Sequence, residues 1–298
     1  MTSTNSNPPD PATAASLVAA LVALMQLEPT GEDRFRGRSD DIGTPAVYGG
    51  QVLGQALLAA QRTVPAERAV HSLHAYFLLP GEHAPIDYTV HRPRDGRSFS
   101  TRHVIARQDG REIFEMAASF QTRDDGIDHQ DDMPPAPDPL AQPTEYERRL
   151  ALGDKVPDDL RLRGLVSQGL EFRVVDAPDL LAPERVAPRS MIWMRAVAPL
   201  PDDPIVHRAV LAYASDNGLL RAAMNPHGLT FLRGRMRVAS LDHAMWFHRD
   251  FRMDEWLLYV IDSPNAGGAR ALCRGSIFTR DGRLVASTAQ EGMIRIRP

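Results

Sequence analysis

The sequence contains a single cysteine, Cys273, and a single lysine, Lys155, among 298 residues. One thiol cannot form an internal disulfide or a cysteine-rich zinc site, and this scarcity suits a reducing compartment. The formal net charge is −4, so no general positive charge would draw the chain to nucleic acid. We therefore expect a cytoplasmic protein that has no nucleic acid partner.

The N-terminal region has no apolar run long enough for a membrane span. Residues 1–14 contain no Lys or Arg and are polar and proline-containing, which predicts a disordered tail. The apolar run that follows, Ala14–Met25, is too short to cross a bilayer. Its leucines recur at helical spacing, so we expect a helix that packs on the body of the protein, with neither a membrane partner nor an export signal.

Three common catalytic and binding signatures are also missing. There is no G-x-S-x-G elbow, so a serine acyl-enzyme of the α/β-hydrolase kind is not supported. The histidines are scattered without metal-ligand spacing, and we expect neither a metal nor a cofactor. The glycine-rich "YGGQVLG" lacks the G-x-G-x-x-G order and the P-loop lysine, which argues against a nucleotide-phosphate loop.

The chain divides at an acidic, proline-rich stretch, residues 124–143, whose composition is typical of a linker. A segment with helical character follows, and a strand-like run begins new material at Leu170. We expect a disordered tail over 1–14, a first unit over 15–123, a linker with a helical segment over 124–169, and a second unit over 170–298.

Both halves show the same order of elements: a strand, an apolar helix and a set of alternating strands. "HAYF" from His74 and "HAMW" from His243 each follow the helix, 169 residues apart. Asp-Gly hairpin turns at Asp109 and Asp281 lie 172 residues apart. We therefore expect an internal duplication in which the two histidines are equivalent.

A long helix followed by an antiparallel meander is an α+β unit in which a curved sheet wraps the helix. The stretch "VYGGQVLGQALLAAQRTVP", from Val47 to Pro65, fits such a helix because it is apolar on nearly all sides. Gly49, Gly50 and Gly54 would let the sheet and a neighbouring helix come close. Two such units would pair their sheets, bury their edge strands and form a pseudo-twofold body.

Seven segments in this order carry a family resemblance: "RFRGRSDDIG", "VYGGQVLGQALLAAQRTVP", "VHSLHAYFLLPG", "RDGRSFSTRHVIARQDGREIFEMAASFQ", "LAYASDNGLL", "DHAMWFHRDFRMDEWLLY" and "DGRLVASTAQEGM". The sequence resembles the acyl-CoA thioesterase II family from about Leu17 to Arg295. That resemblance implies a double hot-dog fold, with two antiparallel sheets each wrapped round a long central helix.

The resemblance also implies a triad that positions a hydrolytic water. The Asp of "ASD" is Asp216, and the Gln of "ASTAQEG" is Gln290. The hydroxyl position before "DHAMWFH" is Ser240, where the family often has threonine. The resemblance further suggests that free amides of Gly50 and Gln51 point at the thioester oxygen.

The chemistry of these side chains fits thioester hydrolysis, which needs a nucleophile, a base and oxyanion stabilisation. We expect Asp216 near the start of the second-half helix, where the helix field favours an ionised carboxylate. Gln290 could hold the water through its carbonyl, and Ser240 could both donate and accept. Without the resemblance, Asp216 would be interpreted as a helix cap and Gln290 as a solvated strand residue.

Histidines offer a rival mechanism. Asp242, His243 and His248 cluster in "LDHAMWFH", and an Asp–His pair could act as acid and base. However, His74 occupies the place of His243 in a half that lacks the triad. We therefore expect Asp242, His243 and His74 to support the site from outside it.

The sequence thus predicts a fatty acyl-CoA thioesterase that releases free fatty acid and CoA and forms a homodimer. One alternative is a hot-dog enoyl-CoA hydratase or dehydratase, which needs an Asp–His pair. Another is a non-catalytic acyl-CoA-binding module, which serine in place of threonine leaves open. Arg94, Arg97 and the "RGRMR" run from Arg233 to Arg237 are candidates for the CoA phosphates, with plain surface solvation as the alternative for each.

Overall fold

The computed structural model describes residues 10–156, 169–233 and 236–296. Helix α1 spans Pro11–Met25 and buries one face, as its leucine spacing predicts. It begins earlier than the expected end of the tail at residue 14, because Asp10 caps it. The Asp10 side chain accepts the amides of Ala12 and Thr13, and Pro11 stands at a position where a missing N–H costs nothing.

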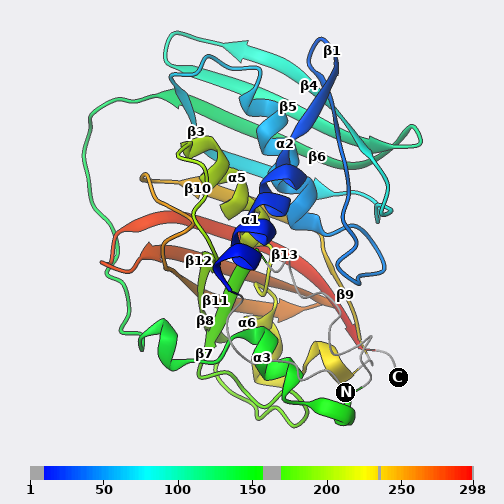
Figure 1. Ribbon diagram of the computed structural model, residues 1–298, viewed down its shortest axis with the longest axis vertical. Helices are drawn as coiled ribbons and strands as arrows, with labels where there is room; N and C mark the ends of the chain where they lie inside the picture. Colours follow the sequence, from blue (N-terminus) through cyan, green and yellow to red (C-terminus); the bar gives the residue numbers. More distant parts are fainter. Residues whose placement is uncertain (1–9, 157–168, 234–235, 297–298) are drawn as a thin grey trace.

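The first half contains one long helix and six strands: β1 (Leu27–Gly31), β2 (Arg34–Gly37), α2 (Gly49–Gln61), β3 (Arg68–Phe77), β4 (Ile86–Asp95), β5 (Phe99–Gln108) and β6 (Arg111–Thr122). The second half repeats this order with additions: β7 (Leu170–Val175), β8 (Arg189–Ala196), α5 (Pro204–Ser215), α6 (Arg221–Met224), β9 (Met236–Ser240), β10 (Asp242–Phe247), β11 (Leu257–Gly267), β12 (Arg270–Thr279) and β13 (Leu284–Ile296). The α+β class with a helix inside each sheet is confirmed (Figure 1).

The two sheets are joined edge to edge into one antiparallel sheet. Its strand order is β1-β2-β4-β5-β6-β3-β10-β13-β12-β11-β8-β7, and β9 adds to β13. The junction is the β3–β10 pair, where Leu73 lies opposite Met245 and both side chains are fully buried. Pairing across this junction removes the exposed edge that each half would otherwise present.

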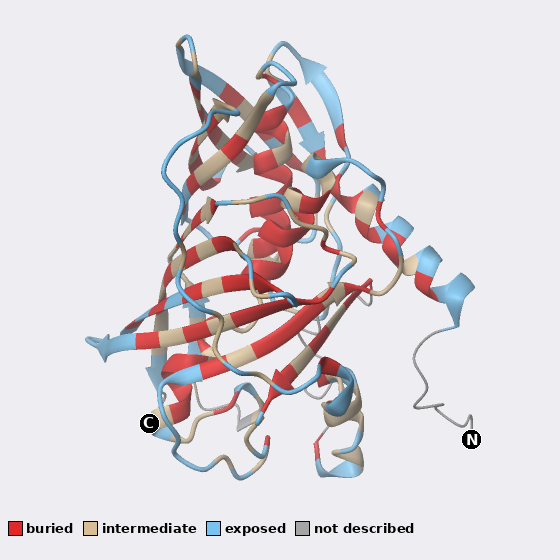
Figure 2. Cartoon of the chain, turned by 90° about the vertical axis from the view of Figure 1, so that its left-hand side faces the viewer, coloured by how far each residue is buried: buried red, intermediate tan, exposed pale blue. Residues whose placement is uncertain are grey.

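Helices α2 and α5 lie against each other inside the curved sheet, and Figure 2 shows both buried along nearly their whole length. They run in opposite directions, since Gly50 meets Tyr213 and Gly54 meets Ala209. A β-carbon on Gly50 would be 2.2 Å from the Tyr213 carbonyl oxygen, and one on Gly54 would be 3.0 Å from that of Ala209. Only glycine permits so close an approach, so the glycines of α2 serve helix packing.

The segment between the halves is fastened to the second half. Gln130 donates to the Gly282 carbonyl and accepts the Leu284 amide, and the Trp193 indole donates to the Pro137 carbonyl. Within the described residues, the expected helical segment contains α3, which spans Glu145–Leu150. Part of that expectation falls on residues 157–168, which lie outside the described residues.

The expected equivalence of His74 and His243 is wrong. His74 is exposed on the outer face of β3, where its ring packs edge-on against Trp246 with centroids 5.3 Å apart. His243 is completely buried on the inner face of β10. Leu73 and Met245 both face inward and are 172 residues apart. The 169-residue offset of the two histidines differs from this by an odd number, and side chains alternate along a strand, so the histidines face opposite sides of the sheet.

Candidate active site

Asp216, Ser240 and Gln290 meet at the junction of the two halves. Asp216 Oδ1 accepts from Ser240 Oγ at 3.1 Å and from Gln290 Nε2 at 2.9 Å. Gln290 Nε2 also donates to Ser240 Oγ, which closes a triangle of hydrogen bonds. Three residues on α5, β9 and β13 therefore form one polar cluster whose innermost member, Gln290, is only 1% exposed.

The expected helix environment of Asp216 is wrong. Asp216 is the C-cap of α5 rather than a residue near its start, and the chain leaves the helix through Gly218, which has a φ of 82°. The negative end of α5 therefore lies at Asp216. The positive helix end that faces this carboxylate belongs to α2: a β-carbon on Gly49, the first residue of α2, would be 2.8 Å from Asp216 Oδ2.

Gln290 is oriented differently from the expectation. Its carboxamide nitrogen donates to Asp216 and Ser240, so its carbonyl oxygen faces inward, 3.3 Å from His243 Nδ1. An oxygen so placed does not face the cluster. Within the cluster, a water would meet the Asp216 carboxylate and the Ser240 hydroxyl rather than the Gln290 carbonyl.

The two proposed oxyanion donors differ in their availability. The Gln51 amide donates to the Tyr48 carbonyl at 3.0 Å, and the Gln51 side chain holds the chain before α2 by binding the Asp40 amide and the Arg38 carbonyl. Gln51 is thus a structural residue, and its amide is already used. Gly50 lies in the first turn of α2, where amides have no intrahelical acceptor, and its oxyanion role stays a prediction.

His243 supports the cluster from its buried side. Its Nδ1 contacts Gln290 Oε1, and its Nε2 lies 3.0 Å from Ser215 Oγ. Burial lowers the pKa of the His243 imidazole, although the nearby Asp216 carboxylate opposes that effect. The imidazole is therefore neutral at pH 7 and acts as a hydrogen-bonding group inside the fold.

Asp242 and His243 do not form an acid–base pair. They are neighbours on β10 and point to opposite faces of the sheet. Asp242 Oδ1 accepts the amide of Glu291 at 2.6 Å, which holds the backbone next to Gln290. His248 lies beyond the end of β10 and contacts Ser287 Oγ at 2.9 Å, and His74 lies on the outer face away from the cluster.

The sequence did not single out two tyrosines that brace the helix ends around the site. The Tyr48 hydroxyl donates to the Tyr213 carbonyl at 2.9 Å, and the Tyr259 hydroxyl donates to the Ser215 carbonyl at 3.1 Å. Burial raises the pKa of both phenols, so both remain proton donors. Both bonds fall on the last turn of α5, where helix carbonyls have no intrahelical donor.

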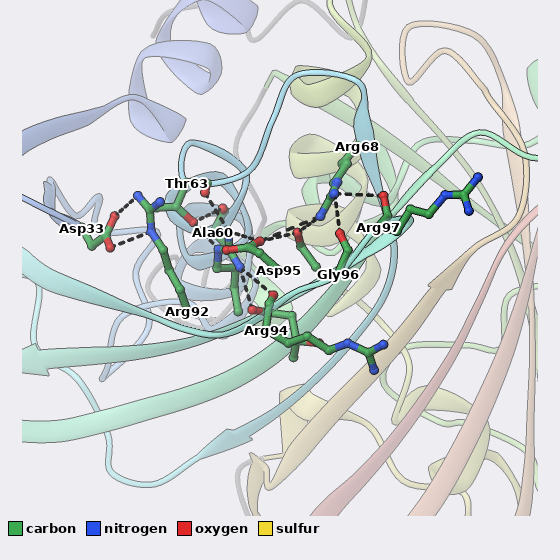
Figure 3. A network of polar contacts seen from close by, with 12 residues as sticks. Asp33, Ala60, Thr63, Arg68, Arg92, Arg94, Asp95, Gly96 and Arg97 are labelled. Carbon is green, nitrogen blue, oxygen red and sulfur yellow. Dashed lines mark hydrogen bonds and ion pairs between the residues drawn. The ribbon is translucent and has the colours of Figure 1, made fainter.

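Two of the candidate phosphate-binding arginines lie far from the cluster along α2. Arg94 lies near the end of β4 and Arg97 lies in the β4–β5 turn. This region packs at the C-terminal end of α2, whereas Asp216 lies at its N-terminal end. There the buried Arg102 binds Thr63 and Asp95, while Figure 3 shows the Arg94 and Arg97 guanidinium groups pointing away from this network.

Arg237 lies on β9, the strand that ends at Ser240, but its side chain points to the opposite, exposed face of that strand. It is exposed and lies directly opposite Arg295 of β13. With the described residues, neither of these two guanidinium groups forms an ion pair. The side chain of Arg233 lies outside the described residues.

Two absences can be stated for the part of the chain that the structure describes. No group of three or more His, Cys, Asp or Glu side chains is placed to hold a metal ion. No helix in that part is long and apolar enough to cross a membrane.

Family models match both halves of the chain. The model described as acyl-CoA thioesterase matches residues 168–293, and the model described as acyl-CoA thioesterase N-terminal domain matches residues 35–121. The two matched stretches contain all three members of the cluster and helix α2.

Known proteins also resemble the chain over nearly its full length. It is 38% identical over 276 residues to "Acyl-CoA thioesterase 2" of Haemophilus influenzae, covering 92% of this chain and 96% of that protein. It is 39% identical over 287 residues to human "Acyl-coenzyme A thioesterase 8", covering 93% and 89%. The crystal structure of acyl-CoA thioesterase II TesB2 from Mycobacterium marinum matches with a TM-score of 0.75 and 44% identity, covering 92% of this chain and 97% of that one.

Proposed function

The chain belongs to the acyl-CoA thioesterase II family, and on that premise we propose that it hydrolyses fatty acyl-CoA to free fatty acid and CoA with a water held at the Asp216 carboxylate, which Ser240 and Gln290 orient. The observation that carries this proposal is the convergence of two donors on one carboxylate oxygen. Asp216 Oδ1 is occupied by Ser240 and Gln290, which turns Oδ2 toward the amino end of α2.

Each group has a definite part in the reaction. Asp216 takes a proton from the water as the water oxygen attacks the thioester carbonyl carbon. The carbon–sulfur bond then breaks, and the proton held by Asp216 passes to the departing thiolate, so that the products are the acid and the CoA thiol. Ser240 and Gln290 hold the carboxylate in place, and the first turn of α2 at Gly50 stabilises the oxyanion.

The hydratase alternative has less support. It needs a carboxylate and a histidine that face one substrate, but Asp242 and His243 face opposite sides of β10. His243 is also completely buried, so it does not reach a substrate directly. A non-catalytic acyl-CoA-binding module would bind acyl-CoA without releasing a thiol. The thiol-release assay below therefore distinguishes it from the proposed enzyme.

The test is thiol release from a series of acyl-CoA substrates by the wild-type protein and by D216N. The isosteric amide keeps the side-chain shape but is a very poor base, so we expect kcat to fall about 10²- to 10⁴-fold with KM little changed. D262N is the control, since Asp262 forms an exposed ion pair with Arg274 on β12. Enoyl-CoA hydration without thiol release would overturn the proposed reaction, and full activity of D216N would overturn the mechanism.

Two wider expectations accompany this function. We propose that the enzyme works in the cytoplasm and as a homodimer of double hot-dog chains. Light scattering coupled to size-exclusion chromatography measures the oligomeric state directly, and a monomeric mass would contradict it.

A further inference from the structure

We propose that His243 is a positioning residue: its Nδ1–H donates to Gln290 Oε1 and thereby fixes which way the Gln290 carboxamide faces. This inference rests on the proposed function, because it explains how one member of the catalytic cluster is held. It assigns to His243 a defined proton position rather than a general supporting role.

The geometry begins with a side chain that has two orientations of nearly equal shape. The oxygen and nitrogen of a carboxamide differ little in size, so packing alone does not choose between them. Gln290 is 1% exposed and His243 is fully buried, so solvent does not supply a missing partner. The choice is therefore made by the hydrogen-bonding groups on either side of the amide.

On one side lies Asp216, whose carboxylate oxygen accepts hydrogen bonds from Gln290 and Ser240. It meets Gln290 Nε2 at 2.9 Å, and the reverse orientation would set two oxygens against each other. On the other side His243 Nδ1 lies 3.3 Å from Gln290 Oε1. An unprotonated Nδ1 would face that oxygen with its lone pair, so the arrangement requires a hydrogen on Nδ1.

The remaining ring nitrogen is consistent with this proton position. His243 Nε2 lies 3.0 Å from Ser215 Oγ, and a neutral imidazole with its hydrogen on Nδ1 needs a donor there. The Ser215 hydroxyl supplies that hydrogen, turning from the Ala212 carbonyl that it also contacts at 2.9 Å. The result is a series of hydrogen bonds that all point the same way: Ser215 donates to His243, His243 donates to Gln290, and Gln290 donates to the carboxylate of Asp216.

This series of hydrogen bonds has a consequence for catalysis. If the Gln290 carboxamide turned over, its oxygen would face both Asp216 and Ser240, and the two hydrogen bonds that Gln290 donates to them would be lost. An unpaired buried polar group is costly, so the base would move away from its working position. Displacement of a catalytic group by about 1 Å costs about 10²-fold in rate.

Two matched variants separate the proton on Nδ1 from the mere presence of a polar side chain. In H243N the amide nitrogen stands near the place of Nδ1 and can donate to Gln290. In H243Q the longer amide reaches toward the place of Nε2 and Ser215, and nothing stands at Nδ1. Both variants bury one carboxamide, so their thermal stabilities should be similar.

We expect the kcat of H243N to exceed that of H243Q by at least about tenfold, with KM nearly the same in both because His243 lies behind the cluster. Equal kcat values in two folded variants would overturn the inference. If D216N loses activity while H243N and H243Q remain alike, this inference fails and the proposed function stands. If D216N keeps full activity, the proposed function itself fails.

A measurement on the wild-type protein keeps the inference testable even if both variants fail to fold. In ¹⁵N NMR spectra of protein labelled at histidine, the buried His243 should show a protonated Nδ1 and an unprotonated Nε2 at neutral pH. The opposite tautomer, or a doubly protonated ring, would overturn the inference. H243Q, or H243N if only that variant folds, identifies the His243 signals by their disappearance, and otherwise through-space contacts to Gln290 identify them.

Discussion

Gly49 of α2 lies directly against the carboxylate of Asp216, such that a β-carbon on Gly49 would be 2.8 Å from Asp216 Oδ2. These residues belong to different halves of the chain, and the contact closes the site between them. Helix α2 contributes its positive amino end and no side chain of the cluster. The second half contributes the three polar side chains, so neither half is a complete site.

The contact predicts separate effects for two adjacent glycines. A methyl group at Gly49 would meet Asp216 Oδ2 and, at 2.9 Å, the Phe77 ring. The main effect of G49A should therefore be a lower kcat rather than a lower free energy of unfolding. A methyl group at Gly50 would meet the backbone oxygen of Tyr213 at 2.2 Å and must push α2 away from α5. G50A should therefore cost about 1–3 kcal/mol or more in the free energy of unfolding.

Steady-state kinetics and urea denaturation measure these two effects. G126A is the control, because a β-carbon on Gly126 meets no atom within 4 Å. Wild-type kcat in G49A would contradict the close approach of α2 to the catalytic carboxylate.

The Ser240 hydroxyl predicts a second pair of variants. S240A removes the donor to Asp216 Oδ1, which lies 3.1 Å away, and the acceptor for Gln290, so we expect kcat to fall about 10²-fold. S240T keeps the hydroxyl and restricts its rotation through the added methyl group, so its kcat should equal or exceed that of the wild type. Kinetics with a single acyl-CoA substrate decide this, and an unimpaired S240A would show that Ser240 is dispensable.

Stability should depend on pH through His207, a buried residue of α5. His207 Nδ1 accepts the Met253 amide at 2.9 Å, and burial lowers the pKa of the imidazole below its ordinary value of 6.5. The folded protein therefore binds fewer protons than the unfolded chain, so the stabilising effect is present above about pH 6.5 and is lost as the pH falls toward the folded-state pKa. One such group changes stability by at most about 1.4 kcal/mol per pH unit.

The measurement is urea denaturation of the wild type and of H207N at several values between about pH 7 and pH 5. The asparagine oxygen can accept the Met253 amide without titrating in this range, so the curve for H207N should be flatter than that of the wild type. Parallel curves would show that His207 is not responsible.

Recognition of the CoA moiety should involve Arg237. Arg237 lies on β9 and is paired with Arg295 of β13. Two neighbouring positive charges of this kind favour the binding of an anion between them. R237A should raise KM for an acyl-CoA about two- to fivefold, since an exposed ion pair contributes at most about 1 kcal/mol. The same acyl group on N-acetylcysteamine, which lacks the nucleotide, should show no change.

R97A is the matched control for this prediction. Arg97 is also exposed but lies at the other end of α2. A KM effect of R97A as large as that of R237A would contradict the assignment.

The members of the cluster could be named from the sequence, but their orientation could not. Asp216, Ser240 and Gln290 came from the family resemblance, and the structure brings the three together. The inward turn of the Gln290 carbonyl toward His243 and the approach of Gly49 to the Asp216 carboxylate depend on neighbours that are distant in the sequence. Such contacts have no local sequence pattern.

The sequence by itself determined the apolar helix of each half, the alternating strands, the hairpin turns and the duplication, because these follow from local periodicity and turn chemistry. Only the tertiary structure decided that His74 faces solvent while His243 is buried, because the facing of a strand depends on its register against the neighbouring strand. Only the packing of α2 against α5 decided what "VYGGQVLG" does. Its glycines bring the amino end of α2 to the carboxylate of Asp216, the residue that caps the carboxyl end of α5.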